Sequence, residues 1–267
     1  MVNHHIPHTY GQRKPIKRPS RKFLTVALLI IVAYIVVLYV FFVSPFSFRW
    51  KALFGEIIYP KDYDLHGIDI SHHQGDIDWD LLRAQGDING SPVCFVMIKA
   101  TEGSDRIDSR FETNFFQAKE HAFICGVYHF WSNSTAPEKQ AQFYIDNVQL
   151  QQGDLPPVLD VETKSKSQSL ETFRNNILTW LDIIEKHYGV PPIIYTGVNF
   201  KEKYLSGEAF NNYPYWIAHY YVEELKYTGE WKFWQYTDVG RLPGIDGFVD
   251  FDTYNGSYYD LKKLTIK

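Results

Sequence analysis

The chain has 267 residues, of which 45% are hydrophobic and 17% aromatic, so it can bury the core of one sizeable domain. Residues 1–22 hold six of the 27 Lys and Arg residues and no acid, which leaves 21 basic side chains against 31 acids and a net charge of about −10 for the rest. We therefore expect no nucleic-acid partner and a preference for neutral or cationic substrates over polyanions, although the clustering of charge matters more than its sum.

The start of the chain predicts a membrane anchor. Residues 23–43 are 21 residues without a charge, enough to cross about 30 Å of hydrocarbon as a helix. By the positive-inside rule, residues 1–22 form a cytoplasmic tail and residues 50–267 lie outside the cytoplasmic membrane. A cleaved signal peptide is the alternative, but the apolar run is longer than usual for one, and residues 43–46 make a poor cleavage site. We expect a single-pass protein with a linker at residues 44–64 and a periplasmic or extracellular domain at residues 65–267.

Eight short apolar runs in that domain are typical of strands. They cover residues 65–71, 93–101, 123–131, 157–162, 192–196, 215–220, 232–236 and 247–253. The last three runs are separated by too few residues for full crossover helices. The pattern predicts an α/β barrel whose first five units are β/α and whose remainder is mostly strand.

Three of the intervening segments carry clear helix signals. Capping-box spacing at Ser109 and at Thr135 predicts helices that run to about residues 121 and 148. Residues 170–188 have apolar side chains at threes and fours, and Gly189 and Pro191 follow them as stop signals.

Paired acids point to chemistry at the strand ends. Asp160 and Glu162 stand two residues apart at the end of an apolar run, so on a strand both side chains would share one face. Two like charges this close raise at least one pKa, as a general acid requires. A solvated strand end is the structural alternative for a single such pair. Asp69 and Asp250 come at the ends of two other runs, however, and β/α barrels place their active sites at the carboxyl ends of their strands.

Aromatic and amide side chains near the same strand ends suit a sugar substrate. Pyranose faces pack on aromatic rings while hydroxyl groups need a few fixed polar partners. The candidates for substrate binding are Tyr128, Phe130, Tyr195, Trp216, Tyr220 and, as an amide donor, Gln235. Each aromatic residue could instead belong to the barrel core. We expect Glu102 to brace a loop through Lys99 and not to act on substrate.

Cysteine and histidine usage leaves one question open and disfavours a metal. Cys94 and Cys125 open two consecutive predicted strands, so they are either a disulfide or two buried free thiols. Five histidines raise the possibility of a metal-dependent polysaccharide deacetylase: His66, His72, His73, His129 and His219. Adjacent residues on a strand point to opposite faces, and these five histidines include no H-x-x-x-H or similar pair, so we expect no metal and no cofactor.

Several motifs in register resemble family 25 of the glycoside hydrolases, the lysozymes first known from fungi, streptomycetes and phages. The earlier motifs are Asp69-Ile70-Ser71-His72-His73-Gln74-Gly75, Met97-Ile98-Lys99-Ala100-Thr101-Glu102-Gly103, Gly126-Val127-Tyr128-His129-Phe130 and Leu159-Asp160-Val161-Glu162. The later ones are Trp216-Ile217-Ala218, Trp234-Gln235-Tyr236 and Val249-Asp250. The resemblance covers about residues 65–261. It implies an irregular TIM-like (β/α)5(β)3 barrel that cleaves the β-1,4 bond between N-acetylmuramic acid and N-acetylglucosamine in peptidoglycan.

The resemblance also implies roles for the acids. Glu162 corresponds to the general acid, and Asp160 to the neighbour that orients a substrate N-acetyl group for attack on the anomeric carbon. Asp69 and Asp250 would complete an acidic rim that stabilises oxocarbenium charge. A covalent role for either of them is the competing mechanism. One departure is Arg106, which stands where the family usually has an aromatic residue or Leu, and it puts the packing of that loop in doubt.

The sequence therefore predicts a membrane-anchored muramidase that acts on peptidoglycan glycan strands, with a monomeric catalytic domain. A catalytically weak wall-binding module that uses the same groove is the main alternative. A scaffold that localises a partner through its acidic surface is the third.

Overall fold

The computed structural model describes residues 21–38 and 57–267. The chain divides into two units, residues 1–51 and residues 52–267, and each is described by itself. In the first, helix α1 (Arg21–Leu38) exposes most of its apolar side chains, Leu28 and Leu29 among them. No helix within the described ranges has the length and apolarity that a bilayer crossing requires. Residues 1–20 of the predicted tail, 39–43 of the predicted span and 44–56 of the predicted linker lie outside the described residues, so the anchor stays a prediction.

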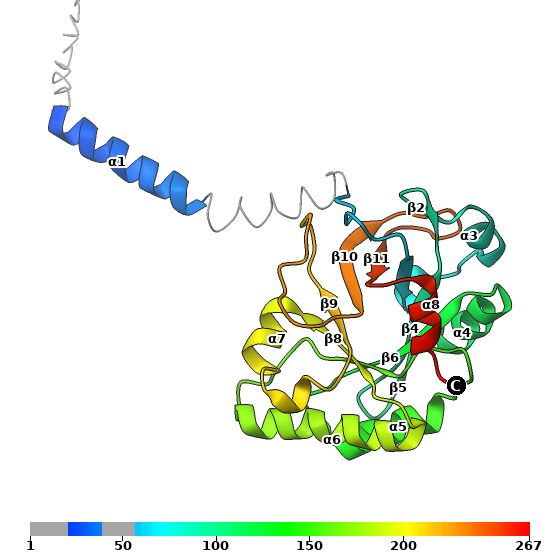
Figure 1. The fold of residues 1–267 in the computed structure, drawn as a ribbon. Coiled ribbons are helices and arrows are strands. Elements are labelled where there is room, and N and C mark those ends of the chain that lie inside the picture. The colour runs from blue at the N-terminus through cyan, green and yellow to red at the C-terminus, as the bar shows by residue number, and fades with distance from the viewer. Residues whose placement is uncertain (1–20, 39–56) are drawn as a thin grey trace, which may run out of the picture. The chain divides into compact units, whose positions relative to one another are not determined.

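The second unit is a closed barrel (Figure 1). Eight strands form it: β1 (His66–Ile70), β4 (Phe95–Glu102), β6 (Ile124–Phe130), β7 (Val158–Asp160), β8 (Ile193–Gly197), β9 (Tyr215–Ala218), β10 (Phe233–Gly240) and β11 (Val249–Tyr254). Neighbouring strands are parallel from β1 to β10 in that order. Strand β11 is antiparallel to both β10 and β1 and closes the barrel. All eight predicted strands are confirmed.

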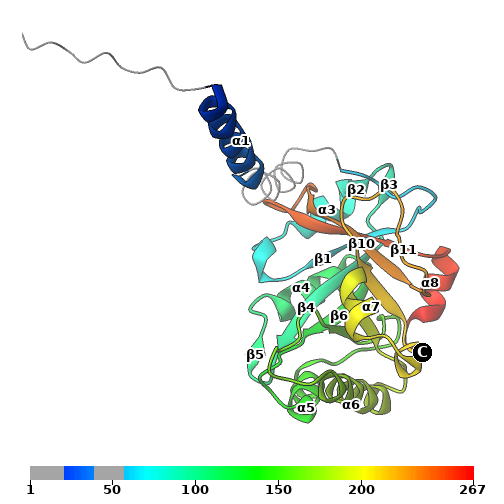
Figure 2. The same ribbon diagram turned by 90° about the vertical axis from the view of Figure 1, so that its left-hand side faces the viewer.

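Five helices follow the first five barrel strands in turn: α3 (Trp79–Gln85), α4 (Phe111–Glu120), α5 (Pro137–Asn147), α6 (Leu170–Tyr188) and α7 (Val198–Tyr204). No helix separates β9, β10 and β11 in this described part of the chain. The (β/α)5(β)3 architecture is therefore confirmed. The smaller elements are η2 (His72–Gln74), β2 (Asp87–Ile88), β3 (Ser91–Pro92), β5 (Arg106–Ile107), η3 (Glu208–Phe210) and α8 (Tyr258–Leu264). Helices α5 and α6 lie side by side against the barrel in both views (Figures 1 and 2).

The helix boundaries follow local chemistry, with two corrections. Helix α6 begins after Ser169, whose hydroxyl accepts the Thr172 N–H, and it ends at Gly189 in the left-handed conformation, as predicted. The predicted caps at Ser109 and Thr135 are wrong. Helix α4 follows Arg110 and helix α5 follows Ala136, in both cases without a side-chain cap.

Other side chains make hydrogen bonds with the backbone at the start of these two helices. The Asp108 carboxylate accepts the Arg110 N–H at 3.0 Å, just before α4. Pro137 occupies the first turn of α5, where a missing N–H costs nothing. A buried amide, Gln140, donates to the Thr135 carbonyl at 2.9 Å.

Strand alternation divides the core into two layers. Of every two successive residues on a strand, one points its side chain into the barrel. The interior cluster formed in this way includes Phe95, Met97, Tyr128, Trp216 and Phe233. The other residue of the two packs against the helices in a larger outer cluster, to which Ile68, Ile98, Val127 and Trp180 belong.

The two cysteines are free thiols in the structure. Cys94 packs against the interior cluster, whereas Cys125 belongs to the outer one. Burial raises the pKa of Cys125 to about 12, which makes its thiol unreactive. The structure therefore supports the free-thiol alternative.

Candidate active site at the carboxyl end of the barrel

The fold brings the four predicted acids to one end of the barrel. Asp69 lies on β1, Asp160 is the last residue of β7, and Glu162 follows two residues later. Because β11 runs antiparallel to the other strands, its first residues reach the same end, and Asp250 pairs in register with Asp69. Four positions spread over 180 residues of sequence therefore surround one mouth.

Asp160 and Glu162 form a coupled pair. Asp160 is only 6% exposed, and burial, followed by the charge of Glu162, raises its pKa well above the usual range. Glu162 is more exposed, but its carboxyl group lies low enough for desolvation to raise its pKa as well. The interaction between the two side chains raises the pKa of Asp160 further and lowers that of Glu162, so it favours the protonated form of Asp160. In the free protein this pair holds a proton under conditions where an isolated aspartate would be ionised.

Asp69 and Asp250 belong to a second acidic group together with Asp252. Burial and then the Asp69 charge raise the pKa of Asp250 to about 9. Burial and the Asp252 charge raise that of Asp69. Asp252 is completely buried and accepts a hydrogen bond from the Trp216 indole at 2.7 Å. Sequence analysis missed Asp252, although its spacing of two residues from Asp250 is the same signal that identified the Asp160 pair.

Gln235 connects the acids to the aromatic side chains. Its amide nitrogen donates to Asp69 Oδ2 at 2.6 Å and to Asp250 Oδ2 at 3.2 Å. Its amide oxygen accepts hydrogen bonds from the hydroxyls of Tyr195 and Tyr220, both at 2.6 Å.

The predicted sugar-binding residues fall into two sets. Tyr128, Tyr195 and Trp216 are at most 8% exposed and form the floor of the site. The Tyr195 and Trp216 rings lie 4.4 Å apart. Phe130 and Tyr220 are partly exposed and line the mouth. Contact of any of these rings with a sugar stays a prediction.

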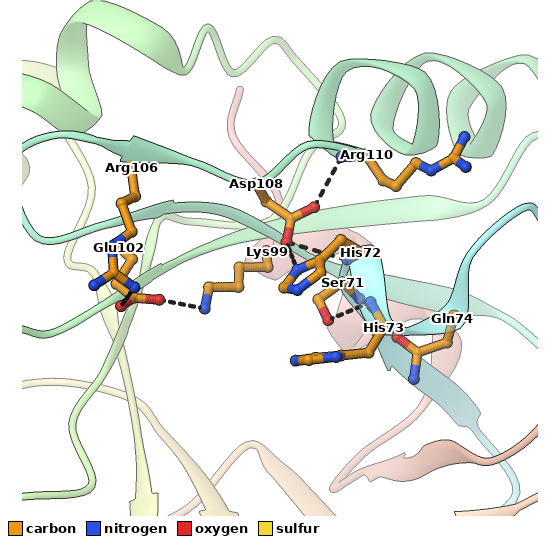
Figure 3. A network of polar contacts seen from close by, with 9 residues as sticks. All are labelled: Ser71, His72, His73, Gln74, Lys99, Glu102, Arg106, Asp108 and Arg110. Carbon is orange, nitrogen blue, oxygen red and sulfur yellow. Dashed lines mark hydrogen bonds and ion pairs between the residues drawn. The ribbon is translucent and has the colours of Figure 1, made fainter.

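Lys99 is a further site residue, because its positive charge lowers the pKa of both Asp160 and Glu162 and so opposes the effect of burial. Its ammonium group lies 4.7 Å from the centre of the Phe130 ring. It also donates to Glu102 Oε2 at 2.8 Å (Figure 3), which confirms that Glu102 is braced through Lys99.

The histidines serve structural contacts. The His72 ring and the buried Asp108 carboxylate are 2.6 Å apart, and the centres of the His72 and His73 rings are 4.1 Å apart with the ring planes tilted by 35° (Figure 3). His129 is fully buried between Thr101 and Gln140, and burial lowers its pKa to about 4. The described residues contain no group of three or more His, Cys, Asp or Glu side chains arranged to hold a metal ion.

A separate cavity of about 390 Å³ lies away from this site. Its lining includes Pro156, Pro191 and Pro214, which precede β7, β8 and β9, together with residues close to the C-terminus. It therefore opens at the amino end of the barrel strands, far from the carboxyl groups, where such barrels do not place their chemistry.

A closed β/α barrel that gathers carboxyl groups of raised pKa beside aromatic side chains at the carboxyl end of its strands is the architecture of a glycoside hydrolase. The glycosyl hydrolases family 25 model matches residues 68–245. The chain therefore belongs to this family, as the resemblance implied.

Known proteins agree with the family match. The chain is 41% identical over 204 residues to the Escherichia coli K12 protein YegX, a region that covers 76% of this chain and 74% of that one. It is 32% identical over 208 residues to lysozyme M1 of Streptomyces globisporus, which covers 72% and 68%. Its fold superposes with a TM-score of 0.70 on a family 25 glycosyl hydrolase from Bacillus anthracis, at 29% identity and over 79% of this chain and 98% of that one.

Proposed function

We propose that this protein is a muramidase, which hydrolyses the β-1,4 bond between N-acetylmuramic acid and N-acetylglucosamine in peptidoglycan. The observation that carries this proposal is the Asp160 and Glu162 pair, which stores a proton at the mouth of a family 25 barrel. The lysozymes among its relatives support the choice of substrate.

Glu162 is the proposed general acid because it is the more accessible member of the pair and can reach a leaving glycosidic oxygen. In the free protein, burial and the Glu162 charge raise the pKa of Asp160, which favours a proton on this more deeply buried member of the pair. A substrate that requires an ionised Asp160 would drive this proton to Glu162. Substrate binding would therefore protonate Glu162 and prepare it to act as the general acid.

The N-acetyl group of the substrate has the chemistry to favour an ionised Asp160. No N–H or O–H group of the described chain donates to Asp160 Oδ1, although that atom is buried. The N–H of an N-acetyl group would supply this hydrogen bond and favour the ionised carboxylate. The acetyl oxygen, turned toward the anomeric carbon, would then act as the internal nucleophile of a retaining reaction.

Direct attack by Asp69 or Asp250 is the competing mechanism. Burial raises the pKa of both groups, and the Asp252 charge raises that of Asp69 further, as the Asp69 charge does for Asp250. These shifts favour the neutral and less nucleophilic forms. To separate the mechanisms, hydrolysis rates are compared on matched acetylated and de-N-acetylated peptidoglycan. Substrate assistance requires that the de-N-acetylated chains resist cleavage. Efficient cleavage of those chains, or a covalent sugar adduct on either aspartate by intact-mass analysis, would exclude it.

The products of digestion test the bond specificity. Purified peptidoglycan is incubated with the full chain in detergent, and the fragments are analysed by mass spectrometry after borohydride reduction. Reduced muramic acid at the new chain ends is the expected result. Reduced glucosamine would mean that the other linkage is cut. Binding of glycan without cleavage would point to the wall-binding alternative.

The proposal extends to location. The run without charge at residues 23–43 and the six basic residues before it support a single-pass anchor in the cytoplasmic membrane, with a monomeric catalytic domain in the periplasm or outside the cell. A membrane-tethered muramidase would act on glycan strands close to the membrane surface.

A further inference from the structure

A cavity of about 260 Å³ lies beside the acidic pair and differs from it in charge. Its lining residues are His72, Lys99, Glu102, Arg106, Ile107, Asp108 and Ser109. Most of them come from β4, β5 and the turn after them (Figure 3). In register, Glu102 pairs with Phe130 on β6, and Phe130 pairs with Asp160 on β7. Two strand spacings, about 10 Å, therefore separate this cavity from the catalytic pair.

The acids in this cavity already have partners. The Lys99 ammonium and the Arg106 guanidinium converge on separate oxygens of Glu102, at 2.8 and 2.7 Å (Figure 3). The buried Asp108 carboxylate accepts the backbone N–H groups of His72 and Arg110 and contacts the His72 ring. Two full positive charges thus share the Glu102 carboxylate, while the Asp108 carboxylate is 1% exposed and is held by backbone N–H groups. The solvent-facing rim of the cavity therefore has a surplus of positive charge, although the four charged side chains that line it balance in sum.

Arg106 presents that surplus to an incoming ligand. Its side chain is 72% exposed, against 15% for Lys99, and in the described part of the chain only its Nη1 atom makes a polar contact. Glu102 holds the guanidinium in place while its remaining N–H groups stay available. Such a planar fork binds carboxylates through two parallel hydrogen bonds.

We propose that Arg106 and Lys99 form a specificity-determining subsite for a carboxylate carried by the muramic acid residues of the glycan strand. This inference rests on the proposed muramidase function. The sugar backbone of peptidoglycan is neutral, and its negative charge resides on the lactyl group of muramic acid or on the stem peptide attached to it. An otherwise acidic site would repel these groups, and this cavity supplies the local positive charge that accepts one of them.

The test measures KM and kcat on three soluble glycan substrates. The first carries intact stem peptides, the second is stripped of peptides by an amidase and has free lactyl carboxylates, and the third is the stripped glycan with those carboxylates converted to methylamides. The wild-type chain in detergent is expected to have a KM about tenfold lower on at least one charged substrate than on the methylamide. Preference for the first substrate alone identifies the stem peptide, and preference for the second identifies the lactyl group.

Two substitutions complete the test. Arg106→Gln should raise KM about tenfold on the preferred charged substrate, leave kcat within about twofold, and leave the methylamide substrate unaffected. Arg83→Gln removes the same charge from helix α3, outside this cavity, and should behave like the wild type on all three. Equal KM values on all three substrates, or an equal loss on the methylamide in Arg106→Gln, would overturn the proposal.

Binding without turnover separates this subsite from the catalytic proposal. The three glycans are titrated calorimetrically into the Glu162→Gln variant, with and without Arg106→Gln. A charge-dependent affinity that disappears with Arg106 supports the subsite even if the wild type hydrolyses nothing, a result that would count against muramidase activity alone. The same affinity for charged and neutral glycans would count against the subsite alone.

Discussion

At the scale of single residues, the site is a set of carboxyl groups held in conditions that a free carboxylate would avoid. Asp69 and Asp160 are buried in the barrel mouth, where desolvation raises the pKa of both and the Asp69 charge raises that of Asp160 further. Gln235 supplies two of the N–H groups that this mouth offers to its acids. Burying these carboxyl groups lowers the stability of the fold, but it also keeps them protonated at higher pH than free carboxyl groups. Acid catalysts commonly combine these two effects.

Replacement of the proposed acid should remove turnover but not the fold. Glu162→Gln keeps the shape of the side chain and loses the proton, so kcat on peptidoglycan should fall at least about 100-fold. Because Glu162 is exposed, the thermal midpoint should change by no more than about 2 °C. Glu120→Gln, on the exposed end of α4, is the matched control and should retain full activity. Near wild-type lysis by the Glu162 variant would show that another group is the acid.

Asp250 should make the protein less stable as pH rises. Its folded pKa of about 9 lies above the unfolded value of 3.8, so its contribution is fully present below about pH 4 and is lost as pH rises through 9. Asp250→Asn has no proton to lose. The variant should therefore melt at least about 2 °C above the wild type at pH 8, with a smaller difference at pH 4. Calorimetric scans across this range check the trend, and a constant difference at every pH would contradict it.

At the scale of elements, strand direction and packing decide what reaches the mouth. Asp250 is the second residue of β11, and it lies at the same end of the barrel as Asp69 because β11 is antiparallel to β1. In a parallel strand, a residue so near the start would lie at the opposite end of the barrel. In β4 the register with β6 shifts between Lys99 and Thr101. An irregularity of this kind re-aims side chains next to active sites, and here Thr101 bonds to His129 while Lys99 bonds to Glu102.

The barrel interior should not tolerate a methyl group at Gly67. A Cβ there would lie 2.4 Å from the ring of Phe95, which is fully buried and packs against Phe233. Gly67→Ala should cost about 1–3 kcal/mol and lower the thermal midpoint by about 2–12 °C. Gly197→Ala is the control, because the nearest atom to its Cβ would be 3.9 Å away. Equal stability of the two variants would mean that the interior can expand.

At the scale of the whole molecule, charge and hydrophobicity are divided along the chain. The basic residues before residue 23 contrast with an acidic remainder, and the described barrel belongs to the unit that begins at residue 52. The barrel positions its chemistry without a metal-binding cluster among its described residues. Two separable tasks, attachment and catalysis, would then reside in separate segments.

The proposed topology is tested in intact spheroplasts. Protease added outside should remove the barrel and leave the first 22 residues protected, because the tail lies in the cytoplasm. Antibody tags at the two termini report the fragments, and spheroplasts lysed before digestion are the control. Detection of a mature chain that begins after Val43 would show a cleaved signal peptide instead.

The sequence by itself determined the barrel architecture and the meeting of four acids at one end of it. Eight short apolar runs predicted the eight strands, and the short spacings between the last three runs predicted that no crossover helix separates them. Both predictions succeeded because strand and helix periodicities are local properties of the sequence. The caps at Ser109 and Thr135 were predicted wrongly, because each helix begins one residue later than the capping-box spacing indicates. The side chains of Asp108 and Gln140, which are near in sequence but do not belong to that motif, make the polar contacts at those helix starts.

Only the tertiary structure decided how the acids share protons and which side chains meet. Burial sets the pKa of Asp160 above that of an isolated carboxyl, and burial is a property of the closed barrel and not of a D-x-E spacing. The four contacts of Gln235 join residues up to 166 positions apart, and no local pattern encodes them. Likewise, Arg106 reads in the sequence as a departure at one loop position, but its placement beside Glu102 and Lys99 makes it part of a cationic cavity, because charge acts through space.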